Sequence, residues 1–153
     1  MADFVFNIVK GKVAQLAKNV DDGSPANSRL IVVPIETTSI EADATLKDHD
    51  TLSALLAGTS NEQTTMGRKT VAAADITITV DDTNERLDID IADITWTGAT
   101  GNAISALVIC YDPDNTAGTD ADLIPLTKHD FVVTPDGSDV VAQIAAAGFY
   151  RAA

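Results

Sequence analysis

Two histidines, His49 and His129, are the only imidazoles that could serve acid–base or nucleophilic catalysis. A hydrolytic triad needs a nucleophile, a base and an orienting acid, and no G-x-S-x-G nucleophile turn occurs in the sequence. His49 stands just before an expected helix, and His129 stands just before an expected strand. We therefore interpret both as loop or cap neighbours rather than catalytic bases.

An acidic segment, Asp112–Asp122, is the one candidate for binding a metal ion. It carries four aspartates and a glycine that together suggest a hard cation such as calcium: Asp112, Asp114, Asp120, Asp122 and Gly118. The spacing of these residues does not match an EF-hand loop. Thr116 stands at the third ligand position, Gly118 comes one residue late, and no glutamate closes the loop. Solvated loop carboxylates are the favoured interpretation, and a calcium site is the alternative to check.

Asp88 and Asp90 are two residues apart on an expected strand, so both should point to the same face. Paired carboxylates of this kind can serve glycosidase chemistry, but a polar strand face is more simply the solvent side. Trp96 is the only tryptophan. It continues the apolar face of a strand, which favours a core position over a ligand platform. No phosphate-binding glycine loop occurs, and we expect no cofactor.

The charge balance narrows the classes of partner. The chain has 153 residues, with 10 Lys and Arg against 23 Asp and Glu, for a net charge of −13. Such a field repels phosphate backbones and anionic lipid, so we expect neither nucleic acid nor membrane as a partner. Cys110 is alone, which is typical of a reducing compartment. The first residues lack the features of a signal peptide, so synthesis in a cytoplasm is expected.

Apolar spacing predicts the helices. Val13–Val20 has the i, i+3, i+4, i+7 spacing of one helical face. Thr51–Ala57 reads as a second helix, with Asp50 as its cap and Gly58 as its stop, and Ile40–His49 can add a separate turn. The polar segment after this helix, Thr59–Thr65, is expected to be an exposed loop.

Period-two alternation predicts a β-hairpin over Ile76–Ile91, with its apolar side chains facing the core: Ile76, Ile78, Val80, Leu87, Ile89 and Ile91. Leu30–Ile35 reads as a buried strand with an edge or bulge at Pro34, which lacks a backbone donor. Further strands are expected at Phe4–Val9, Ile94–Trp96, Ala103–Tyr111, Phe131–Thr134 and Val140–Ile144, the last two joined by a tight turn at Pro135–Ser138.

These elements predict a mainly β fold: one antiparallel β-sandwich or jelly-roll-like domain over residues 1–153, with one or two short helices and termini that extend from it. Alternating strand–helix units are absent, which disfavours a doubly wound nucleotide-binding fold.

Several blocks of sequence resemble a family of small virion proteins of tailed bacteriophages. The blocks are Met1–Ile8 with Lys10-Gly11, Ile40–Leu46, Asp50–Leu56, Cys110–Asp114, Ala117–Asp120, Ile124–Thr127, His129–Phe131 and Ala147–Ala152. They span nearly the whole chain. The resemblance implies a non-enzymatic capsid cement or decoration protein on the outer surface of the virion capsid, made in the bacterial host cytoplasm.

The partner implied is the major capsid protein, and symmetric lattices favour a homo-oligomer, either dimer or trimer. Two alternatives stay open: a tail or head–tail connector component, and a carbohydrate-binding adhesion module. The segments expected to contact a partner are Met1–Lys12, with Lys10 and Lys12, and Gly148–Ala153, with Phe149, Tyr150 and Arg151. Phe149 and Tyr150 could equally close the core of this domain, so that choice also stays open.

Overall fold

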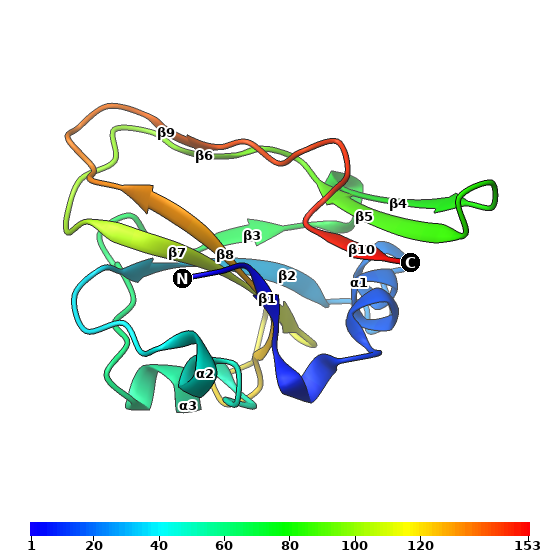
Figure 1. Cartoon of the computed structure of the whole chain (residues 1–153), viewed down its shortest axis with the longest axis horizontal. Coiled ribbons are helices and arrows are strands. Elements are labelled where there is room, and N and C mark those ends of the chain that lie inside the picture. The colour runs from blue at the N-terminus through cyan, green and yellow to red at the C-terminus, as the bar shows by residue number, and fades with distance from the viewer.

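Ten strands in three antiparallel sheets make up most of the fold (Figure 1). The computed structural model describes all residues, 1–153. The strands are β1 (Phe4–Val5), β2 (Arg29–Glu36), β3 (Lys69–Val71), β4 (Ile76–Asp81), β5 (Arg86–Ile91), β6 (Ile94–Trp96), β7 (Ile104–Asp112), β8 (Ile124–Val133), β9 (Val140–Ala142) and β10 (Tyr150–Ala152). Three short helices, α1 (Val13–Asp21), α2 (Asp43–Leu46) and α3 (Leu52–Ala57), and two 3-10 turns, η1 (Asn7–Val9) and η2 (Ala73–Asp75), complete it. The prediction of a mainly β, antiparallel fold is confirmed.

The largest sheet has the order β1-β8-β7-β2-β3. Its centre is β2 against β7, two apolar strands that are buried along nearly their whole length. Pro34 is accommodated in β2 because the pairing with β3 ends before it, at Val32. Its carbonyl oxygen accepts a hydrogen bond from the backbone amide of Gln63 at 2.9 Å. On the other side Pro34 pairs in register with Leu107, and the register shifts only between Ile35 and Glu36. The predicted edge at Pro34 is confirmed on the β3 side, and the bulge lies just after it. Cys110 lies on β7, fully buried.

The helices follow their predicted faces. On α1, Val13, Ala17 and Val20 are fully buried. The cap of α3 differs from the prediction: Thr51, not Asp50, has the extended backbone of an N-cap, and its hydroxyl oxygen accepts a hydrogen bond from the Ala54 amide at 3.1 Å.

The segment Thr59–Thr65 is a loop, as predicted, and most of it is exposed, but Ser60 and Gln63 are buried. Gln63 is 1% exposed, and its amide group donates to the carbonyl oxygens of Thr100 and Asn102 while accepting from the backbone amides of Thr65 and Met66. A polar side chain with every hydrogen bond satisfied is stable inside a protein, which is why composition alone misleads here.

The hairpin forms as predicted, with Ile76 opposite Ile91 and Ile78 opposite Ile89. The apolar side chains of the hairpin become more exposed toward its turn. Ile76, Ile89 and Ile91 are buried, whereas Val80, near the turn, is 65% exposed. The prediction for Val80 is therefore wrong, because the tip of the hairpin projects beyond the large sheet and nothing covers it (Figure 1).

The C-terminal strands pair with distant parts of the chain. The turn at Pro135–Ser138 leads from β8 into β9, but β9 pairs with β6, so the two strands do not form a hairpin. The tail forms β10 and pairs with β5, and β1 pairs with β8. Both ends of the chain are thus built into sheets rather than extending from the domain.

Candidate functional site

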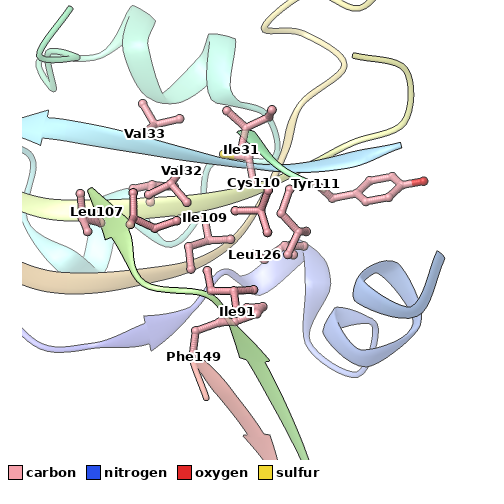
Figure 2. Close-up of a cluster of buried hydrophobic side chains, with 14 of the residues drawn as sticks. Ile31, Val32, Val33, Ile91, Leu107, Ile109, Cys110, Tyr111, Leu126 and Phe149 are labelled. Carbon is pink, nitrogen blue, oxygen red and sulfur yellow. The ribbon is translucent and has the colours of Figure 1, made fainter. Parts of the chain in front are cut away.

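An apolar cavity of about 250 Å³ lies between the large sheet and the strands that cover one of its faces. Its floor includes Val32, Leu107 and Ile109 from β2 and β7, and its cover includes Ile91 and Phe149. Figure 2 shows Ile91 and Phe149 coming from the covering strands toward the strand that carries Ile109. A pocket of this size and lining can hold an apolar side chain.

A groove of about 310 Å³ runs beside the cavity, between β1 and β10. The cavity and the groove share Asp3, His129, Gly148 and Phe149, so they form one continuous surface, here called the terminal cleft. Its walls come from the first and last strands of the chain. Exposed carboxylates at its rim come from Asp3 and Asp130, beside the apolar floor.

The tail reaches this position through Gly148. Its φ is +78°, and a Cβ built there would lie 2.0 Å from the carbonyl oxygen of Ile89. Only glycine fits such a close backbone approach at a positive φ. From this turn the amide of Phe149 donates to the carbonyl oxygen of Ile89 at 2.9 Å, which starts the pairing of β10 with β5.

His129 occupies the junction of cavity and groove. Its Nδ1 lies 3.4 Å from an Asp3 carboxylate oxygen, and its Nε2 lies 3.0 Å from the Thr127 hydroxyl. Asp3, His129 and Thr127 have the residue types of an acid, a base and a nucleophile. A catalytic series would bury the acid and expose the nucleophile, and here the opposite holds. Thr127 is 2% exposed and cannot easily meet a substrate, whereas the Asp3 side chain is 62% exposed. Burial lowers the pKa of His129 against the opposing effect of Asp3, so its imidazole is neutral at pH 7.

The predicted partner-binding residues are split between two places. Phe149, Tyr150 and Arg151 line the groove, but Phe149 is 7% exposed and belongs to this domain's own core. Arg151 pairs with Asp88 across β10 and β5. Lys10 and Lys12 are exposed and lie away from the cleft, in the turn before α1.

The Asp88 and Asp90 side chains do share one strand face, but they are not a catalytic pair. The Arg151 guanidinium donates two hydrogen bonds to Asp88 and lowers the pKa of that carboxyl, so Asp88 holds no proton to donate. Asp90 accepts a hydrogen bond from the adjacent Ile91 amide at 2.9 Å.

In the acidic loop, each carboxylate is engaged with the protein. Asp112 and Asp114 accept from backbone amides two residues ahead, and Asp122 accepts from Thr119. Asp120 pairs with Arg68, which also binds Glu62 through two hydrogen bonds and so ties the loop to the segment before β3. No group of three or more potential ligands lies together in the structure.

Three polar side chains with structural roles escaped the sequence analysis. Lys128 is fully buried and binds the carbonyl oxygen of Ala2 at 3.0 Å and the carboxylates of Asp43 and Asp130. Gln63 and Arg68 are the other two. Alternation could not have found Lys128, because Pro125–Lys128 are all buried and Asp130, on the same strand face as Lys128, is exposed.

No protein-family model, curated protein or solved structure matches the chain. None of the helices is long and apolar enough to cross a membrane. The likeness to virion proteins of tailed phages therefore stays an expectation from the sequence.

Proposed function

We propose that this chain is a non-enzymatic virion protein of a tailed phage, a capsid cement protein that binds the outer face of the shell and bridges capsomers through the major capsid protein. One observation carries the proposal. Three sequence blocks of the resemblance, Met1–Ile8, His129–Phe131 and Ala147–Ala152, are far apart in the chain but line the terminal cleft together. This convergence is what a shared binding surface would require.

The cleft suits an apolar side chain next to a basic group. Its floor is apolar, and Asp3 and Asp130 place carboxylates at its rim. A protein that binds the assembled shell better than free capsomers stabilises the shell by linkage. Repetition over a symmetric lattice adds avidity, so each copy needs only modest affinity. The net charge of −13 favours a place away from packaged DNA.

Two finer features belong to the same proposal. The smaller sheets, β10-β5-β4 and β6-β9, cover one face of the large sheet, an arrangement that supports classing the domain as an open β-sandwich. On the particle, the protein is a symmetric dimer or trimer, which is the usual way in which lattice proteins exploit local symmetry.

The test combines imaging with a matched pair of variants. Ala145 is exposed and lines the cavity, whereas its exposed neighbour Ala146 lines no part of the cleft. Ala145→Glu should abolish binding of purified protein to shells that lack it, and Ala146→Glu, with the same charge change, should leave binding unchanged. Equal binding by both variants contradicts the assignment of the cleft.

Imaging of virions then separates the functions. Density over capsomer junctions supports a cement protein, whereas density confined to the tail or neck assigns the protein to the tail or head–tail connector. Absence of the protein from virions, together with binding of the purified protein to host polysaccharide, would replace the proposal by the carbohydrate-binding alternative.

A further inference from the structure

We propose that the outer edge of β4 binds an extended segment of another protein as an added β-strand, and that this segment carries basic residues at both ends. The edge lies outside the terminal cleft, and the proposal does not depend on the virion function.

The backbone at this edge is unpaired. β4 is the last strand of the sheet β10-β5-β4. The carbonyl oxygen of Ile89 accepts from Phe149 on the β10 side, so Ile78, directly opposite Ile89, turns its own N–H and C=O away from β5. By the same alternation, Val80 also points its N–H and C=O outward, whereas the N–H of Ile76 already donates to the carbonyl oxygen of Ala73.

The edge lacks most of the devices that protect edge strands from pairing. Natural proteins shorten such strands, bend them with bulges, or place lysine or proline in them. β4 has six residues, Ile-Thr-Ile-Thr-Val-Asp, and pairs with β5 without a register shift. Val80, 65% exposed, adds an apolar side chain to the open edge. Main-chain hydrogen bonds would supply affinity, and alternate side chains would supply selectivity.

Charge decides the kind of occupant. Asp75 and Asp82 are exposed at the two ends of β4, and Asp81, next to Asp82, forms an ion pair with Arg86 at 3.2 Å. If a second copy paired with this edge in the register centred on Ile78, Asp81 of each copy would face Asp75 of the other. Like charges directly opposite one another destabilise a sheet. A segment with lysine or arginine at each end meets the same aspartates favourably.

The probe is a blocked peptide, Lys-Thr-Val-Thr-Val-Thr-Lys, and the measurement is amide hydrogen exchange of the full chain, resolved by residue. We expect exchange at Ile78 and Val80 to slow about tenfold or more at saturating peptide, because these two amides gain partners. Exchange at Thr77 and Thr79 should not change, since these amides already bond to β5. The same peptide with glutamate in place of lysine should bind more weakly, by roughly two- to fivefold for each charge reversed.

Val80→Pro removes one outward donor without touching the ladder to β5, and prolines are tolerated at such edge positions. It should weaken peptide binding, whereas Val80→Thr, the matched control, should retain it. Unchanged exchange at the Ile78 and Val80 amides, or equal binding of the lysine and glutamate peptides, overturns the proposal. Protection that rises with protein concentration in the absence of peptide would assign the edge to a second copy and overturn it as well.

Discussion

Truncation of Phe149 tests whether the tail belongs to the core of this domain. Phe149 is 7% exposed, and it is the only buried side chain on the segment Phe149–Ala153 that includes β10. Replacing a core phenylalanine by alanine costs about 3–5 kcal/mol. Because the ring borders a cavity of about 250 Å³, part of its surface already lacks neighbours, so we expect the lower end, about 3 kcal/mol.

For a chain of this length, that loss corresponds to a fall in Tm of roughly 6–12 °C. The assay is thermal and urea unfolding of Phe149→Ala, with Phe149→Leu as a control that keeps most of the apolar volume and should lose about 1 kcal/mol. Amide exchange of Tyr150–Ala152 should rise more than that of β7, since β10 holds to β5 over only three residue pairs.

A Tm of Phe149→Ala within about 2 °C of the parent protein would refute this reasoning. It would mean that Phe149 contributes little to the folded state of the isolated chain. The interpretation of Phe149 as an anchor for a partner would then be favoured instead.

Three other changes have outcomes that follow from single contacts. Gly148→Ala should cost at least about 2 kcal/mol in urea unfolding and expose β10 to exchange, because its Cβ would meet the Ile89 carbonyl oxygen at 2.0 Å. Arg68 lowers the pKa of Asp120 by hydrogen bonding, so this pair stabilises the fold above the unfolded value of 3.8 and loses that contribution as pH falls through the folded pKa. Arg68→Met should therefore lower stability at pH 7 and flatten its acid dependence in urea titrations between pH 6 and about pH 3. Melting curves with calcium and with chelator should coincide, since the carboxylates of Asp112–Asp122 are engaged internally, and a shift of several degrees would restore the calcium hypothesis.

Patterns within short stretches of sequence were enough to predict the β4–β5 hairpin and helix α1. The hairpin follows from strict alternation on both of its strands, and α1 follows from one apolar face. Val80 shows where this reasoning stops. Alternation predicts which face of the strand Val80 occupies, but its burial depends on what lies over that face, and the large sheet does not extend to the tip of the hairpin.

Long-range pairing is the part that the sequence could not supply. The β9 strand follows a turn that is suited to a hairpin, yet it pairs with β6, more than forty residues earlier in the chain. Lys128 has the composition of a solvent-exposed residue, but the carboxylates that neutralise it come from Asp43 and Asp130, of which only the second is a sequence neighbour. Buried charges need partners, and the more distant partner is invisible until the fold is known.

Five of the ten lysines and arginines of the chain form ion pairs within the domain, and this bears on both proposals. Lys18, Arg68, Arg86, Lys128 and Arg151 all form ion pairs with carboxylates of the domain. Asp130 at the cleft rim pairs with Lys128, and Asp81 at the end of β4 pairs with Arg86. The carboxylates left without a lysine or arginine of the same chain are Asp3 at the rim and Asp75 and Asp82 at the ends of β4. A partner that brings lysine or arginine to either place gains attraction at short range and faster encounter at long range, and both effects weaken with salt. The two places remain separable, because Ala145→Glu alters only the cleft and Val80→Pro alters only the edge.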